Sequence, residues 1–139
     1  MSFKNQTIVV TGAAGNLGSA VAKTFYEANA RVVLVDAKGE FLDRRFPDSD
    51  NRYVKVPVNL LQREIVLSAF AKIQDEHDGI DALCAIAGGF HMGEAVHDTA
   101  TDIWELMNDL NVQTLLNSTA AVVPHMIERG GGKIVTIGA

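Results

Sequence analysis

The sequence predicts an α/β domain with a doubly wound, five-stranded parallel sheet in the order 3-2-1-4-5. Three observations support this prediction. Short apolar, β-branched runs alternate with helical patterns along the 139 residues, which is typical of βαβ units. Closely spaced glycines follow the first run, as in sheets that bind nucleotides. No repeat or linker-like stretch interrupts the alternation, so we expect one domain over residues 1–139.

Five apolar runs have the length and composition of strands that are buried on both faces of a sheet. Glycine, aspartate or proline stands at or just after the end of each of the first four, where turns are expected. After the fifth run only Gly138 and Ala139 remain, so we expect this strand at an edge, with the sheet truncated there. The five runs are residues 7–10, 31–36, 53–56, 82–86 and 133–137.

The segments between these runs carry apolar residues at helical spacing. Leu17, Val21 and Phe25 mark a helix after the first strand, and a similar row over residues 61–73 marks one after the third. A short helix or loop is expected over residues 40–45. A long helical segment is expected over residues 101–128, and a break near its middle stays open as an alternative.

Composition excludes several partners. The formal net charge of −5 gives no electrostatic basis for binding nucleic acid or an anionic membrane. The single cysteine, Cys84, cannot form an internal disulfide, which fits a reducing compartment. The longest apolar run, residues 82–87, is too short to span a bilayer, and the N-terminus lacks a signal-peptide pattern. We therefore expect a cytoplasmic protein without a membrane or nucleic-acid partner.

Three glycines, Gly12, Gly15 and Gly18, recur at every third position between the first strand and the first helix. Gly12 would allow a tight turn, Gly15 would remove a Cβ where a pyrophosphate approaches, and Gly18 would let the helix pack closely on the sheet. The helix N-terminus would then offer free N–H groups and a partial positive charge to phosphates. The alternative is a glycine-rich turn that binds no ligand.

Two polar residues follow the second and third strands. Asp36 lies eighteen residues after Gly18, close to the ~20 typical of a carboxylate that binds the adenosine ribose. A carboxylate here favours NAD(H) over NADP(H). Lys38 would reduce this preference, so NADP(H) stays open as a cofactor. The alternative is that Asp36 caps the following loop. Asn59 could face the adenine ring or cap the next helix.

Together these residues resemble the short-chain dehydrogenase/reductase family over residues 7–139. The glycine spacing is similar to the extended branch of the family, and Asn59-Leu60 stands where the family usually has Asp-Val beside the adenine. Residues 85–88 stand where it usually has Asn-Asn-Ala-Gly, and residues 110–112 are similar to its Asn-Val motif. Residues 87–90 are similar to a dihydropteridine-reductase-like subgroup.

The resemblance implies a Rossmann-like fold, an NAD(P)-dependent oxidoreductase and a homo-oligomer, with a small carbonyl or alcohol substrate in the intact enzyme. It also implies roles for single residues. Asn111 would support a proton relay as a catalytic residue, and the alternative is that its side chain satisfies local backbone groups. The implied dinucleotide-binding residues are Gly12, Gly15, Asn16, Leu17, Gly18, Asp36, Asn59, Leu60, Ala87, Gly88 and Gly89.

The main departure from the family concerns its Tyr-x-x-x-Lys motif. The only tyrosines are Tyr26 and Tyr53, and Ala30 and Pro57 stand four residues later. Ala139 occupies the position of the family's serine. We therefore expect a cofactor-binding portion that is inactive alone. The alternatives are a non-catalytic dinucleotide-binding module or redox-sensing subunit, and a scaffold with an empty site. The four histidines have no cysteine or carboxylate partner at metal-ligand spacing, so we expect no metal site.

Overall fold

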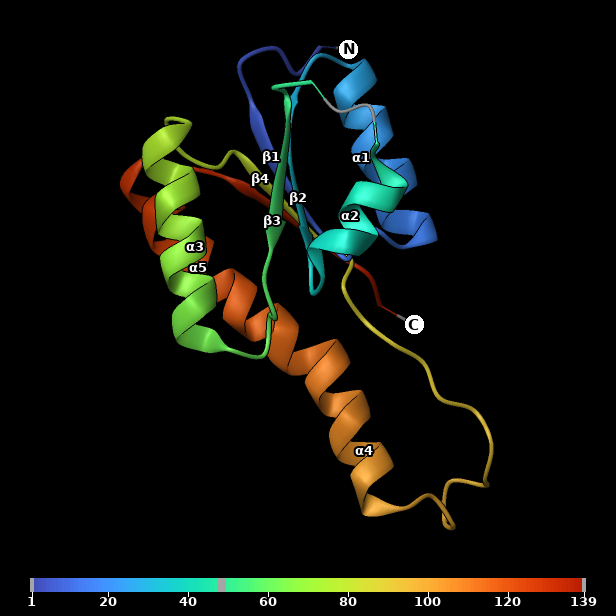
Figure 1. Cartoon of the computed structure of the whole chain (residues 1–139). Coiled ribbons are helices and arrows are strands. Elements are labelled where there is room, and N and C mark those ends of the chain that lie inside the picture. Colours follow the sequence, from blue (N-terminus) through green and yellow to red (C-terminus); the bar gives the residue numbers. More distant parts are fainter. Residues whose placement is uncertain (1, 48–49, 139) are drawn as a thin grey trace.

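The computed structural model describes residues 2–47 and 50–138 and contains one five-stranded parallel sheet (Figure 1). Its strand order is β3-β2-β1-β4-β5, and all four strand pairings are parallel. The predicted Rossmann-like architecture is thereby confirmed. The strands are β1 (Thr7–Thr11), β2 (Arg31–Asp36), β3 (Tyr53–Pro57), β4 (Ala82–Ala85) and β5 (Lys133–Thr136).

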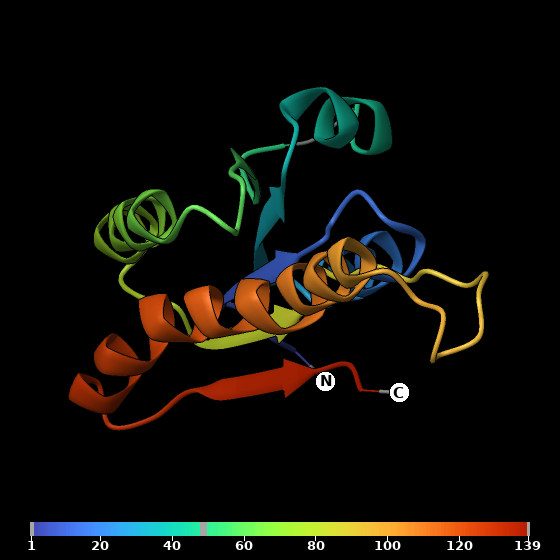
Figure 2. The same ribbon diagram turned by 90° about the horizontal axis from the view of Figure 1, so that it is seen from below.

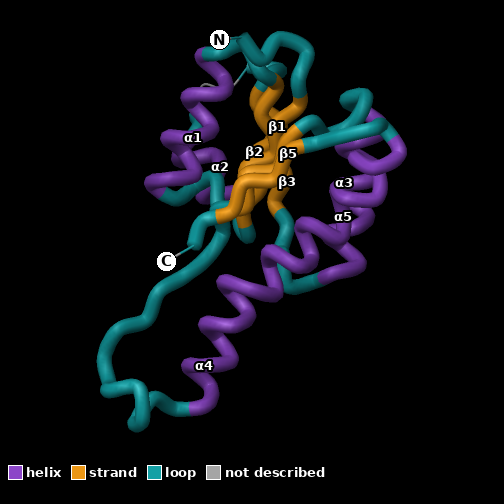
Figure 3. Tube along the Cα trace, turned by 180° about the vertical axis from the view of Figure 1, so that it is seen from behind, coloured by secondary structure: helices purple, strands orange, loops and turns teal. Residues whose placement is uncertain are grey.

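Helices cover both faces of the sheet, as the view from behind shows (Figure 3). Helices α1 (Asn16–Glu27) and α2 (Gly39–Arg45) lie on one face. Helices α3 (Arg63–Glu76) and α5 (Thr114–Glu128) lie side by side on the other. Parallel strands need such crossovers, and the crossover helices shield the sheet from water.

The alternation of side chains along the central strands builds two apolar layers. Val9 and Val33 pack toward α3 and α5, whereas Val10 and Leu34 pack toward α1 and α2. All four side chains are fully buried. Because successive residues of a strand point to opposite faces, continuous β-branched runs are what a sheet covered on both faces requires.

The long helical segment of residues 101–128 is continuous (Figure 2). Helix α4 (Thr101–Asn108) passes through a five-residue π-helical turn, η1 (Asp109–Gln113), into α5. The expected alternative of a break is therefore wrong: the helix changes its hydrogen-bond pattern instead of ending. Helix α4 buries none of its residues, and it extends away from the sheet together with the loop after β4 (Figure 1).

Strand β5 lies at the sheet edge, where it pairs with β4. All four of its residues are exposed, and its position at the edge agrees with the prediction from the sequence. Along the part of the chain that the structure describes, no helix combines the length and the apolarity needed to cross a membrane. Ala139, which the resemblance places at the family's serine position, lies outside the described residues.

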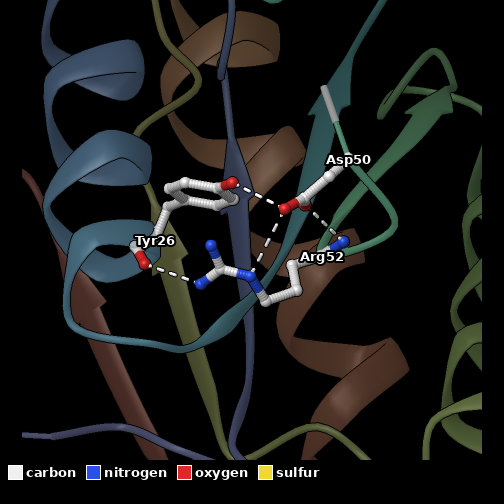
Figure 4. A network of polar contacts seen from close by, with 3 residues as sticks. All are labelled: Tyr26, Asp50 and Arg52. Carbon is white, nitrogen blue, oxygen red and sulfur yellow. Dashed lines mark hydrogen bonds and ion pairs between the residues drawn. The ribbon is translucent and has the colours of Figure 1, made fainter. Parts of the chain in front are cut away.

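A polar network fastens the end of α1 to the segment that enters β3 (Figure 4). The Tyr26 hydroxyl donates to Asp50 at 2.7 Å, and the Arg52 guanidinium donates to the Tyr26 carbonyl at 2.9 Å. The hydroxyl of Tyr26 holds the pKa of Asp50 below its usual value. The Tyr26 ring also stacks on Tyr53 with 4.2 Å between centroids, so the network orders this side of the sheet.

Candidate binding site at the carboxyl edge of the sheet

A cavity of about 940 Å³ opens at the carboxyl ends of β1, β2 and β4. The strand order reverses at this point, and open α/β sheets bind ligands in such a crevice. Most of the residues singled out from the sequence come together in its wall, whereas Gly89 and Asn111 do not line it. The lining residues from that set are Gly12, Gly15, Asn16, Leu17, Gly18, Asp36, Asn59, Leu60, Ala87 and Gly88.

The glycine turn after β1 is sterically tight. Gly12 has a φ of +63°, which glycine adopts without strain, and a Cβ on it would lie 2.9 Å from the Cα of Ala87. A Cβ on Gly18 would lie 2.8 Å from the carbonyl carbon of Gly12. Gly18 therefore lets α1 approach closely the turn that follows β1.

The N-terminus of α1 carries unused hydrogen-bond donors. The amides of the preceding turn are satisfied: Ala13 donates to Val35 O at 3.1 Å and Gly15 donates to Gly12 O at 3.0 Å. The first N–H groups of a helix have no intrahelical acceptor, and α1 has neither a side-chain cap nor an acidic residue in its first turn. Among the described residues, nothing accepts from the amides of residues 16–18, so this wall of the cavity suits an anion.

Asp36 both organises the turn and lines the cavity. One of its oxygens accepts from the Ala14 amide at 3.0 Å, and the other accepts from the Ala37 amide at 2.9 Å. The loop-capping alternative thus describes part of what this carboxylate does. Each carboxylate oxygen has more than one lone pair, so the half-buried group can still accept bonds from ribose hydroxyls.

Asn59 forms a turn rather than a helix cap. Its Oδ1 accepts from the Leu61 amide at 3.0 Å, an Asx-turn, whereas α3 begins at Arg63 with Gln62 as its N-cap. The N-cap alternative is therefore wrong. The next residue, Leu60, is 6% exposed, and its carbonyl accepts from Asn117 of α5 at 2.8 Å.

The chain leaving β4 is held by the last residue of β1. The Thr11 hydroxyl accepts from the amides of Ile86 and Ala87 at 3.0 and 3.1 Å. Thr11 is 1% exposed, so these bonds are sheltered from water. No motif in the sequence indicated this role of Thr11 at the exit of β4.

Asn111 lies in the π-helical turn and reaches the glycines after β4. Its Oδ1 accepts from the Gly89 amide at 3.1 Å, and its Nδ2 donates to the carbonyls of Gly89 and Met107, both at 2.9 Å. A Cβ on Gly88 would lie 2.7 Å from this Oδ1. The side chain thus satisfies backbone groups, the alternative left open by the sequence, and its part in proton transfer stays a prediction.

Helix α2 contributes cavity residues that sequence reasoning missed, among them Phe41, Arg44 and Arg45. The Arg45 guanidinium donates to Ala14 O at 3.0 Å and to Asn16 Oδ1 at 3.1 Å. The only local signal was two basic residues in the last turn of a short helix. That pattern usually reflects the helix dipole, so it did not indicate a contact with a turn some thirty residues away.

Among the residues that the structure describes, the remaining histidines and the cysteine form no second catalytic or metal centre. His91 pairs with Glu94 at 3.3 Å beside a smaller cavity of about 320 Å³ between the loop after β4 and α4. Cys84 is buried, and burial raises the pKa of its thiol. Within residues 2–47 and 50–138, no three His, Cys, Asp or Glu side chains gather as metal ligands would.

Known proteins share this sequence pattern. A family model described as short chain dehydrogenase matches residues 6–139. The NAD-dependent glycerol dehydrogenase of Listeria innocua is 30% identical over 136 residues, which cover 98% of this chain and 53% of that protein. An NADP-dependent 3-hydroxy acid dehydrogenase of Shigella flexneri is 29% identical over 95% of this chain and 53% of its own length. The chain thus spans about half the length of these curated relatives.

Solved structures share the fold. The crystal structure of gox2181 superposes with a TM-score of 0.93 at 27% identity and covers 99% of this chain and 55% of its own. The apo form of LigO from Sphingobium sp. strain SYK-6 superposes with a TM-score of 0.89 at 28% identity, over 98% of this chain and 52% of its own. With the family match over nearly the whole sequence, the chain belongs to the short-chain dehydrogenase family.

Proposed function

We propose that this chain is the dinucleotide-binding portion of an NAD(P)-dependent oxidoreductase. The observation that carries the proposal is the meeting of the unsatisfied amides of residues 16–18 and the Asp36 carboxylate in one cavity. The amides suit a pyrophosphate, and the carboxylate suits ribose hydroxyls. The turn at Asn59 and Leu60 would border the adenine, and Ala87, Gly88 and Gly89 would lie on the nicotinamide side.

Asp36 also supports a preference for NAD(H) over NADP(H). A 2′-phosphate beside this carboxylate would be repelled by up to ~4 kcal/mol at a separation of about 4 Å and an effective dielectric constant of about 20. Lys38, two residues further on, would offset part of this repulsion. The relatives include both NAD-dependent and NADP-dependent enzymes, so the preference rests on Asp36.

The intact enzyme would act on a small alcohol or carbonyl compound. The named relatives, a glycerol dehydrogenase and a 3-hydroxy acid dehydrogenase, both act on compounds that carry a hydroxyl group. A bound nicotinamide would exchange a hydride with the carbonyl carbon. The accompanying proton needs an acid–base group, and this chain lacks the Tyr-x-x-x-Lys pair, so we propose that it gives no turnover alone.

A second candidate is a non-catalytic dinucleotide-binding module or redox-sensing subunit. The same cavity supports it, because a formed dinucleotide cavity fits a binding module as well as the cofactor-binding portion of an enzyme. Steady oxidation of NADH by the chain with aldehydes or ketones would exclude this candidate. In either case we propose a homo-oligomer, which the family match supports.

Titration calorimetry with NADH tests the proposal, and Gly15→Ala is the variant that bears on it most sharply. Gly15 has a φ of −70° and a ψ of 170°, so alanine can adopt this backbone conformation. Its methyl would lie 3.2 Å from the Gly12 carbonyl oxygen, where a pyrophosphate must approach, and a thermal melt of the variant checks that the turn stays folded. We expect NADH to bind the unsubstituted chain and the Kd to rise at least about tenfold in the variant.

Gly131→Ala is the matched control, because a Cβ there meets nothing within 4 Å. It should bind NADH as the unsubstituted chain does. Failure of the unsubstituted chain to bind NADH, or equal affinity in the chain and the Gly15 variant, would contradict the proposal.

A further inference from the structure

We propose that Arg45 is a positioning residue that keeps the glycine turn open toward the pyrophosphate of a dinucleotide. This inference rests on the proposed function and extends it to a residue of α2. The Arg45 guanidinium bridges α2 and the turn through two hydrogen bonds, to Ala14 O at 3.0 Å and to Asn16 Oδ1 at 3.1 Å. Both partners line the same cavity as Arg45 itself.

The first contact fixes a peptide group of the turn. The Ala14 amide donates to Asp36 Oδ2 at 3.0 Å, and the Ala14 carbonyl accepts from Arg45. The residue is thus held by its N–H on one side and by its carbonyl on the other. Because Ala14 immediately precedes the N-cap residue Gly15, this clamp sets the direction in which the first turn of α1 presents its amides.

The second contact restrains a competing acceptor. Asn16 is the first residue of α1, and asparagine side chains readily accept bonds from nearby backbone amides at helix starts. A side chain folded back in this way would occupy donors that a phosphate needs. Arg45 engages Asn16 Oδ1 instead, and the amides of residues 16–18 remain available to a ligand.

The packing around α2 places Arg45 at this position. Leu42 and Phe46, four residues apart, are both buried in the core on this face of the sheet. The Phe46 ring lies 5.1 Å from the Tyr53 ring, which stacks on Tyr26 of the network in Figure 4. The backbone at Arg45 is therefore anchored on both sides, although its side chain is exposed.

Arg44 provides a matched comparison. It precedes Arg45 on the same helix, carries the same charge and lines the same cavity. Within residues 2–47 and 50–138, no hydrogen bond joins Arg44 to the glycine turn. A purely electrostatic effect on a bound phosphate would be similar for the two arginines, whereas a positioning effect belongs to Arg45 alone.

The test measures the Kd of NADH, ADP-ribose and adenosine for the purified chain and for Arg45→Met, Arg45→Lys and Arg44→Met. We expect Arg45→Met to raise the Kd of NADH and of ADP-ribose about fivefold, a change of about 1 kcal/mol, which is the net contribution of one typical hydrogen bond. Adenosine has no pyrophosphate, so its Kd should stay within about twofold. Arg45→Lys keeps the charge and one donor group, so its Kd for NADH should lie between that of Arg45→Met and that of the unsubstituted chain.

A double-mutant cycle separates positioning from other effects. In an Asn16→Ala background, Arg45→Met should cost less NADH affinity than in the unsubstituted chain, because one of the two partners is already gone. Thermal melts of each variant confirm that it is folded. Should Arg45→Met prove unstable, Arg45→Lys gives the same comparison with a smaller change.

Three results would overturn the role of Arg45: equal losses in Arg45→Met and Arg44→Met, equal weakening of adenosine and ADP-ribose, or an NADH affinity within twofold of the unsubstituted chain in Arg45→Met. Each of these leaves the proposed function standing, because NADH still binds the unsubstituted chain. Absence of NADH binding by the unsubstituted chain would overturn both claims.

Discussion

Asp36 holds two backbone amides while it lines the cavity, so a substitution there has two consequences. Replacement by alanine would remove both the charge and the acceptors for Ala14 and Ala37. Asparagine removes the charge but keeps one acceptor oxygen. It is therefore the variant that isolates the electrostatic effect on cofactor choice.

We predict that Asp36→Asn narrows the difference in affinity between NADH and NADPH. The carboxylate would repel a 2′-phosphate, and this repulsion weakens as salt screens the exposed charges. Calorimetric titrations at low and high salt should therefore show a ratio of Kd values closer to one in the variant, and in the unsubstituted chain at high salt. Tighter binding of NADPH than of NADH by the unsubstituted chain would contradict the assignment.

At the scale of elements, the link between the ends of β1 and β4 depends on one hydroxyl group. The Thr11 oxygen accepts from two amides of the chain leaving β4, and Thr11 is buried. Valine has nearly the same shape but offers no acceptor. A valine here would leave two sheltered N–H groups unsatisfied.

We predict that Thr11→Val lowers the free energy of unfolding by about 2 kcal/mol, since an unsatisfied buried donor costs about 1–3 kcal/mol. Thr11→Ser keeps the hydroxyl and serves as the control, with a smaller loss from the missing methyl group. Urea denaturation followed by circular dichroism measures both. Equal stability of the valine variant and the unsubstituted chain would show that water or backbone shifts replace the bonds.

The elements themselves were predictable from the sequence because their signals are local. The β-branched runs around Val9 and Val33, the glycine turn and the spacing to Asp36 need only neighbouring residues to be interpreted. Gly18 shows the limit: its close packing was foreseen, but its nearest contact, the backbone of Gly12 in the turn, was not. The π-helical turn at Asn111 left no pattern that distinguishes it from a break.

The site residues that the sequence did not reveal act through distant contacts. Arg45 reaches a turn 29–31 residues away, and Asn117 reaches a carbonyl 57 residues away. Neither contact follows from periodicity or motif spacing, because each depends on how two elements pack. Arginine in the last turn of a helix and asparagine within a helix are common in exposed helices, so neither residue indicates a distant contact from the sequence alone.

At the scale of the whole molecule, the fold places the residues of the candidate site around one crevice. The reversal of strand order places the ends of β1, β2 and β4 around a single crevice, and α1 points its unsatisfied amides into it. The smaller cavity beside Phe90 and Trp104 lies outside this crevice, on the segment that extends from the sheet. We therefore expect a dinucleotide to bind in the crevice and not on the extended segment.

The most direct test of this claim follows the backbone amide signals of the chain by NMR while NADH is added. We predict that the amides of Asn16, Leu17 and Gly18 shift most as their N–H groups gain phosphate acceptors, with smaller shifts around Asp36 and Leu60. Unchanged signals at residues 16–18, or shifts confined to residues 90–107, would contradict the account.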